Sequence, residues 1–228
     1  MIAGTGGAFQ AVLENSSLNN NVRNAIRAVL TGGSTTGMLT ATNMTGTGSG
    51  EHGIFLSVAG GAILNTSTLT GVDVSNSGQL GNAGLADAVN IDVSGIDVSG
   101  MGSQATVNLI NVLGMNTLGN TTQESGLRQV VATGGQLTTV VSGSNFSFNQ
   151  ISGINTRLRN AGTIVNLTVT GTTVNGGATS APNADGFLFD NDSGNFTANV
   201  TTSSFNNSGR NAIRGLGGAP SEIGRAHV

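Results

Sequence analysis

The residues best suited to chemistry in this chain are three aspartates near its C-terminal end. Asp190 and Asp192 are two positions apart, so in an extended strand both side chains point to the same side. Asp185 lies in the turn just before them. Such carboxylates could bind a sugar, cleave a glycosidic bond or coordinate a cation, with Ca²⁺ the one cofactor left open. Solvated turn carboxylates are the alternative. Three further aspartates lie between aliphatic residues and should face out from strands: Asp73, Asp92 and Asp97.

Arginine supplies all of the side-chain positive charge, because the chain contains no lysine. Four arginines each follow an aliphatic residue of a strand-like segment, and we expect one outward-facing column of Arg27, Arg128, Arg159 and Arg214. The segments that contain Arg128 and Arg159 are adjacent, and this pair could bind carboxylate or sulfate groups of an anionic glycan. The alternative is a solvated face that discourages aggregation of strand edges.

The other reactive residue types offer little. His52 lies in a turn beside Glu51, which could tune it as an acid or base, but we expect an exposed turn histidine. Cysteine is absent, so thiolate chemistry and Cys/His metal sites are excluded. Eight arginines with a net charge of −3 form no basic patch for nucleic acid. No apolar run approaches the roughly 20 residues of a membrane helix.

An internal repeat must position these residues. Residues 16–27 recur as residues 203–214 with nine of twelve positions identical, and degenerate copies lie between them. Each copy holds a strand-like segment, a small-residue turn, a second segment that ends in a hydroxyl residue and usually glycine, and a third short segment. Alternating β-branched and small polar residues indicate strands rather than helices. A period of about 30 residues is typical of a solenoid.

The repeat predicts an all-β fold, a right-handed parallel β-helix (solenoid) of about six to seven rungs with three short strands per rung. Phe146/Phe148 and Phe187/Phe189 should fill the core, since both members of a pair share a strand face. The pentapeptide Ile-Asp-Val-Ser-Gly at residues 91–95 repeats only once, at residues 96–100. One inward column is predicted from Ile26, Ile54, Ile91, Leu127, Leu158, Phe187 and Ile213.

Threonine pairs form a further pattern on the predicted strands. Stacked Thr-x-Thr rows resemble those of ice-binding β-helices, but the pattern is not kept between Thr68 and Thr168. Threonine is also simply a good strand residue. The pairs are Thr40/Thr42, Thr66/Thr68 and Thr168/Thr170.

Over residues 8–219 the repeat resembles that of bacterial right-handed parallel β-helix proteins. The Ala-Ile-Arg strand, the Gly-Gly turn and the Ser-Phe-Asn-Asn-Ser-Gly closure are similar to those of secreted, adhesin-like and autotransporter-like chains. The resemblance implies a bacterial cell-surface or extracellular location and a structural, adhesive role in contact with glycans or cell-surface components. Pectate-lyase-like enzymes share the fold, so a polysaccharide lyase or glycoside hydrolase is the alternative, and an ice- or surface-binding module is a third. We favour a role without catalysis.

The last residues do not fit the repeat. Residues 222–228 resemble a translated sequencing adapter, and we expect them to be a non-native tail. Residues 1–221 would then be a single β-helix repeat fragment of a longer protein. A solenoid cut between rungs exposes strand edges and apolar stacking positions, so we expect the isolated fragment to associate end to end.

Overall fold

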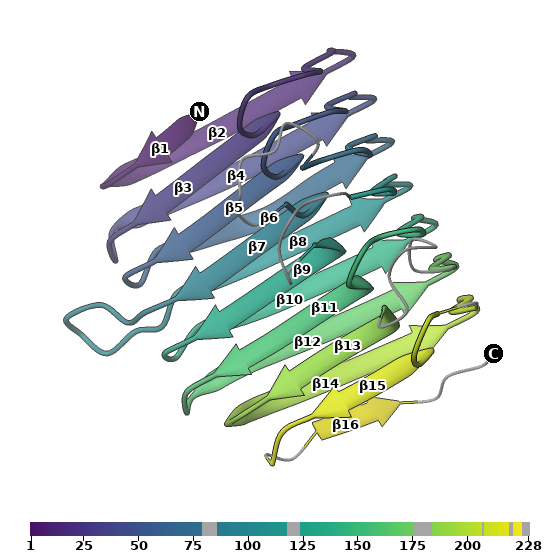
Figure 1. Cartoon of the computed structure of the whole chain (residues 1–228). Coiled ribbons are helices and arrows are strands. Elements are labelled where there is room, and N and C mark those ends of the chain that lie inside the picture. Colours follow the sequence, from purple (N-terminus) through teal and green to yellow (C-terminus); the bar gives the residue numbers. More distant parts are fainter. Residues whose placement is uncertain (79–85, 118–123, 176–183, 207, 219–220, 225–228) are drawn as a thin grey trace.

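The computed structural model describes residues 1–78, 86–117, 124–175, 184–206, 208–218 and 221–224. Within these residues every regular element is a β-strand. The strands form two eight-stranded sheets, here sheet A and sheet B, and consecutive strands alternate between them. All strand pairings are parallel, and Figure 1 shows the strands stacked from one end of the molecule to the other. The chain is an all-β parallel β-helix, which confirms the fold class predicted from the repeat.

Sheet A contains the odd-numbered strands and sheet B the even-numbered strands. The strands of sheet A are β1 (Ile2–Gly4), β3 (Ile26–Thr31), β5 (Ile54–Ala59), β7 (Val89–Ser94), β9 (Ser125–Ala132), β11 (Ser152–Arg159), β13 (Asp185–Asn191) and β15 (Ile213–Leu216). The strands of sheet B are β2 (Gly7–Glu14), β4 (Thr35–Thr42), β6 (Ile63–Thr70), β8 (Gln104–Ile110), β10 (Gln136–Ser142), β12 (Thr163–Thr170), β14 (Gly194–Thr201) and β16 (Ser221–Gly224). Strand β16 includes the first residues of the expected tail, and residues 225–228 of that tail lie outside the described residues.

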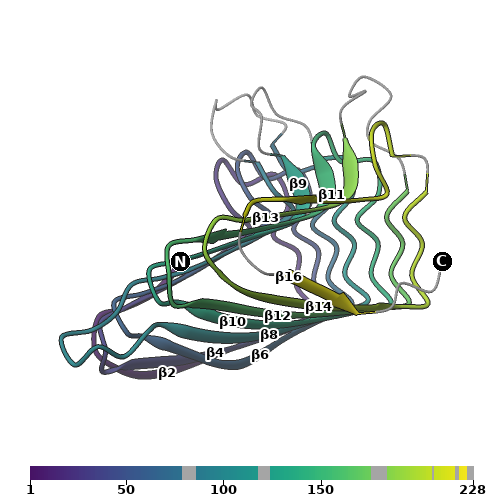
Figure 2. The same ribbon diagram turned by 90° about the horizontal axis from the view of Figure 1, so that it is seen from below.

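The third side of each rung is a single β-bridge position, where the sequence predicts a short strand. Figure 2 shows the coil turned by 90°, with the two sheets on different sides and the chain returning between them. The bridges are parallel and stack in register, so each rung is closed on three sides. They connect Ser17, Thr45, Asp73, Leu113, Asn145, Thr173 and Ser204.

The hydrophobic core consists of the inward-facing residues of both sheets. The inward column that starts at Ile26 and Ile54 continues through Val89, Leu127, Ile154, Phe187 and Ile213. The prediction was therefore wrong for two members. Ile91 is paired with Leu56, and Leu158 is paired with Val131, so both face inward in other columns. When the alignment of a strand is shifted by two residues, the same side chains still face inward. The alternation of apolar and polar residues therefore does not reveal such a shift.

Of the two predicted aromatic core pairs, one is confirmed. Phe187 is fully buried, and Phe189 packs beside it with ring centroids 6.0 Å apart. Phe146 is also fully buried, but Phe148 is 49% exposed. Phe148 has a φ of 59°, a left-handed conformation that breaks the alternation of strand faces.

A left-handed corner follows each sheet-B strand from β2 to β14. Asn15 and Asn43 have positive φ there, and Gly71, Asn111 and Gly143 occupy the same corner in later rungs. Each of these residues donates its backbone N–H to the carbonyl that ends the next sheet-B strand; for Asn43 this is the Thr70 carbonyl, at 2.9 Å. Asparagine and glycine tolerate this conformation best, which explains the glycine that closes the second segment of the repeat.

Candidate functional site

Charged side chains are divided unequally between the two sheets. We call the outward surface of sheet A face A and that of sheet B face B. No outward position of the six strands β4, β6, β8, β10, β12 and β14 is charged. The outward positions of sheet A, by contrast, include Arg27, Asp92, Arg128, Arg157, Arg159, Asp190 and Arg214.

The predicted column of four arginines is only partly present. Arg27, Arg128 and Arg214 share one outward column of face A, but Asn155 occupies the place expected for Arg159. Arg159 lies four residues further along β11, where it pairs with Ala132 of β9. Arg128 and Arg159 are therefore on the same face and on adjacent strands, but they are not neighbours in register.

Asp190 and Asp192 lie on one side of their segment, as predicted, and both contact Arg159. The Arg159 Nη2 atom is 2.6 Å from Asp190 Oδ2, and Arg159 Nη1 is 2.5 Å from Asp192 Oδ2. The hydrogen bond to Asp190 is the main cause of the raised pKa of Arg159. Two of the predicted carboxylates and one predicted arginine thus form a single ion-pair cluster, with Arg159 one-third exposed.

Asp185 does not join that cluster. Its side chain is fully buried, where it accepts hydrogen bonds from Arg210 Nη2 at 2.6 Å and from Asn211 Nδ2 at 3.1 Å. Arg214 Nη1 lies 3.6 Å away. The three predicted aspartates therefore lie in two places. Asp185 is buried against Arg210, and Asp190 and Asp192 contact Arg159 at the surface. No group of three or more metal-ligating side chains with suitable geometry occurs among the described residues.

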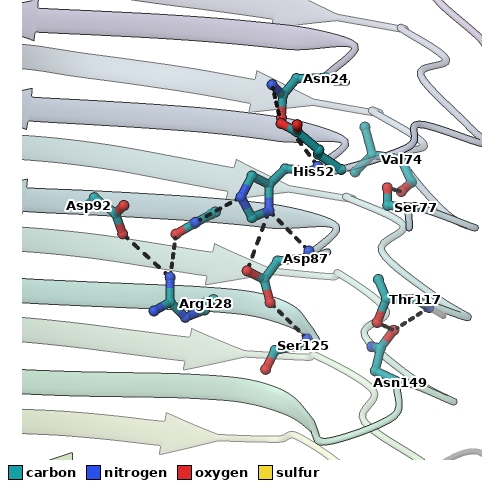
Figure 3. A network of polar contacts seen from close by, with 12 residues as sticks. Asn24, His52, Val74, Ser77, Asp87, Asp92, Thr117, Ser125, Arg128 and Asn149 are labelled. Carbon is teal, nitrogen blue, oxygen red and sulfur yellow. Dashed lines mark hydrogen bonds and ion pairs between the residues drawn. The ribbon is translucent and has the colours of Figure 1, made fainter. Parts of the chain in front are cut away.

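Arg128 faces outward as predicted, yet it is only 7% exposed. Its Nη1 atom lies 3.4 Å from Asn90 Oδ1 and 3.7 Å from Asp92 Oδ1 (Figure 3). Burial raises the pKa of Asp92, and the charge of Arg128 partly opposes that shift. Arg128 is thus held in a polar network on face A and is not a freely solvated cation.

His52 is also buried, so the expectation of an exposed turn histidine was wrong. Its residue exposure is 5%, and its ring stacks on Phe55 with centroids 5.4 Å apart. His52 Nε2 lies 3.2 Å from Asn90 Nδ2, which connects the imidazole to the Arg128 network (Figure 3). Burial, and secondarily the charge of Arg128, lower the pKa of His52 to about 3. The imidazole is therefore neutral near pH 7.

A ladder of polar residues runs along the corner before sheet A. The backbone N–H of His52 donates to Asn24 Oδ1 at 3.2 Å. The N–H of Asp87 donates to His52 Nδ1 at 3.0 Å, and the N–H of Ser125 donates to Asp87 Oδ1 at 2.8 Å. Each side chain thereby satisfies a backbone donor one rung further on. Burial raises the pKa of the Asp87 carboxyl well above its ordinary value.

This ladder could have been found from the sequence with a better alignment of the repeats. His52, Asp87 and Ser125 each stand two positions before the inward aliphatic residue that starts the sheet-A strand. Aligning the third copy on Ile91 in place of Val89 moved Asp87 out of step with His52. A shift of two residues in the alignment therefore separates the members of this buried polar ladder.

Two polar residues of face A lack partners among the described residues. Asn155 is fully buried, and neither its Oδ1 nor its Nδ2 atom has a hydrogen-bond partner. Arg157, two positions further on the same face, forms no ion pair with a described residue, and its Nε atom is buried without a partner. Burial, followed by the charges of Arg128 and Arg159, lowers the pKa of Arg157. Buried polar groups of this kind are normally satisfied by water or a ligand.

Face B carries columns of mostly hydroxyl and amide side chains, each interrupted by one aliphatic residue. Thr40 is in register with Thr68, and the column continues through Asn108, Val140 and Thr168. The partner of the Thr40/Thr42 pair is thus Thr68/Thr70, and not the predicted Thr66/Thr68, because β6 has an irregularity between Leu64 and Ser67. In β8 and β10 these outward positions are occupied by residues other than threonine, as the sequence indicated. The second column starts at Glu14 of β2 and continues through Thr42, Thr70, Ile110, Ser142, Thr170 and Thr201.

A comparison of the chain with models of protein families, with curated proteins and with solved structures found no match. Among the described residues, no helix has the length and apolar character needed to cross a membrane. The two outer faces are therefore the features from which a function can be inferred.

Proposed function

We propose that this chain is a structural and adhesive segment of a secreted or cell-surface bacterial protein, and that face A contacts carbohydrate. The observation that carries the proposal is the gathering of charged and unpartnered polar side chains on face A. A continuous core under two eight-stranded sheets makes the segment a rigid support for that face.

Arg157 is the centre of the proposed contact. A guanidinium presents a fork of donors that matches a carboxylate or sulfate. Asp190 lies beside Arg157 in register and attracts it, but Asp190 is ion-paired with Arg159, and Arg157 forms no ion pair with a described residue. Its partial exposure leaves it open to solvent. The Asn155 amide beside it can donate and accept hydrogen bonds, directly or through an ordered water. Together these groups suit an acidic sugar, with its carboxylate on Arg157 and a hydroxyl linked to Asn155.

Binding to polygalacturonate, a polyuronic acid, tests this role, with neutral dextran as the comparison polymer. Arg157→Gln should weaken polygalacturonate binding about tenfold, the effect of losing one charge-assisted contact of about 1.4 kcal/mol. Arg23→Gln is the matched control, because Arg23 lies outside the strands of sheet A and pairs with Glu51. Binding should also weaken as salt is added. Equal affinity of Arg157→Gln and Arg23→Gln would contradict the proposal.

The enzyme alternative calls for acidic residues that converge on one lateral groove with a nearby arginine. On face A, Asp190 and Asp192 gather around Arg159. Asp190 and Asp192 are each engaged by Arg159, however, and Asp92 lies beside Arg128. Their charges are thus used in ion pairs, and His52, with a pKa of about 3, is neutral near pH 7 and cannot act there as an imidazolium acid. This arrangement favours binding over catalysis. New reducing ends or unsaturated products during the polygalacturonate incubation would instead support the lyase or hydrolase.

Face B favours a second role, contact with an uncharged, repetitive surface such as ice. From β4 to β14 its in-register columns carry no charge, and they place side chains about 4.8 Å apart between strands and about 6.7 Å apart along each strand. Thr168→Arg would introduce a charge at the centre of this face. If the role is correct, the chain should co-purify with growing ice and the variant should not. Failure of the unmodified chain to co-purify would remove this candidate.

A further inference from the structure

Arg159 carries a carboxylate on each of its two terminal nitrogens. Its Nη2 atom is 2.6 Å from Asp190 Oδ2, and its Nη1 atom is 2.5 Å from Asp192 Oδ2. A carboxylate or sulfate that binds a guanidinium end-on uses this same pair of nitrogens. The two aspartates therefore occupy the place that the acidic group of a bound sugar would take on Arg159.

The backbone holds both aspartates at this place. Asp190 lies in β13, where it pairs in register with Arg157 of β11. Asp192 lies in the turn between β13 and β14, and its backbone N–H donates to the Leu158 carbonyl at 3.2 Å. Because both carboxylates belong to the same chain as Arg159, they compete with a free ligand at a high effective concentration.

Arg157 and Arg159 would together form a larger site than Arg157 alone. They are two positions apart on the outward side of β11, which separates them by about 6.7 Å along the strand. Burial, followed by the charges of Arg128 and Arg159, lowers the pKa of Arg157, and the charge of Asp190 opposes this shift. Asp190 thus contacts one of the two arginines and acts electrostatically on the other.

We propose that Asp190 and Asp192 form an autoinhibitory contact, which closes Arg159 as a second position for acidic sugars beside Arg157. This inference rests on the carbohydrate role proposed for face A and identifies what limits it. While the aspartates stay on Arg159, an acidic polymer contacts this part of face A through Arg157 alone. Once they are displaced, both arginines bind neighbouring acidic groups of one chain, so the ligand class is a polymer of acidic sugars.

Replacing both aspartates by asparagine tests the contact, because asparagine keeps the size of the side chain and removes its charge. Asp190→Asn/Asp192→Asn should bind polygalacturonate about tenfold more tightly than the parent, through one added charge-assisted contact. Adding Arg159→Gln to this double variant should remove the gain. Asp192→Asn alone changes the more exposed carboxylate, so it should keep the melting temperature of the parent and show part of the gain.

Asp73→Asn/Asp97→Asn is the matched control, because it removes two negative charges outside face A. Asp73 lies at a β-bridge position of the third side. Asp97 lies in the connection between β7 and β8 and not in a strand, which corrects the prediction from the sequence. In each, Oδ1 accepts a backbone N–H, from Ser75 at 3.0 Å and from Ser99 at 2.8 Å, and asparagine preserves this acceptor. The control should gain less than about twofold in affinity, since its charges are distant and screened by salt.

The outcomes separate this inference from the role proposed for face A. If Arg157→Gln weakens binding but Asp190→Asn/Asp192→Asn binds like the parent, the autoinhibitory contact is overturned and the carbohydrate role stands. An equal gain in the control pair overturns the contact as well, because total charge then explains the gain. A gain that survives Arg159→Gln also overturns it. If polygalacturonate binds neither the parent nor the double variant, both proposals fail.

Discussion

Face A and face B belong to the same coil, share one core and have the same strand spacing, yet they carry different chemistry. From β4 to β14, face B repeats uncharged side chains in columns, where like residues stack without penalty. Face A carries charges, and each pair of described ionic partners lies across strands or rungs, such as Arg159 with Asp190. Identical charges one rung apart would repel, so a charged face must vary from rung to rung. Face A is therefore the irregular surface of the solenoid, and this irregularity supports the proposal that it binds a specific ligand.

The largest expected effect comes from breaking the core that both faces share. Leu127 is fully buried in the column between Val89 and Ile154. Leu127→Asp should destabilise the chain by more than about 4 kcal/mol, because it places an unpaired carboxylate in an apolar interior. Val130→Ala, on the outward side of the same strand, should cost less than about 1 kcal/mol. Urea denaturation of both variants measures the difference, and similar midpoints would refute the assigned strand faces.

The next effect concerns the buried pair at the edge of face A. Asp185→Ala would leave Arg210 and Arg214 without their buried acceptor. The loss should be about 2–3 kcal/mol, less than for a fully buried pair, because both arginines are partly exposed. Thermal denaturation measures it. A variant as stable as the parent would mean that this pair does not support face A.

The histidine ladder should make stability depend on pH. Because the pKa of His52 is lowered from 6.5 to about 3, the neutral imidazole favours the folded state above pH 6.5. That contribution is lost progressively as the pH falls from about 6.5 towards 3, by on the order of 4 kcal/mol in total. The raised pKa of Asp87 acts in the opposite direction and destabilises the folded state as the pH rises above its ordinary value of 3.8. Urea unfolding at several pH values should show a smaller decrease for His52→Gln than for the parent.

The smallest expected effect lies on face B. Thr168→Ala removes one partly exposed side chain from an uncharged column and should change stability by no more than about 0.5 kcal/mol. The same variant should leave polygalacturonate binding unchanged. Thermal melts and binding titrations of this variant sharpen the contrast between the faces, and a large loss in either measurement would show that the two faces are coupled.

The sequence predicts whether a strand residue faces inward or outward better than it predicts which residue of the adjacent strand it pairs with. Alternation correctly assigned Ile91 and Leu158 to the interior and Arg128 and Arg159 to the exterior, since side chains alternate with a period of two. It misplaced Ile91, Leu158 and Arg159 in register because a two-residue shift leaves the face unchanged. The burial of outward residues such as His52 was also missed, because it depends on neighbours from several rungs that one repeat does not reveal.

The most direct test of the account is a titration of polygalacturonate into the parent chain, Arg157→Gln and Thr168→Gln under identical conditions. The account predicts that the face A variant binds about tenfold more weakly, while the face B variant matches the parent. Equal losses in both variants, or a loss in Thr168→Gln alone, would contradict the assignment of carbohydrate contact to face A.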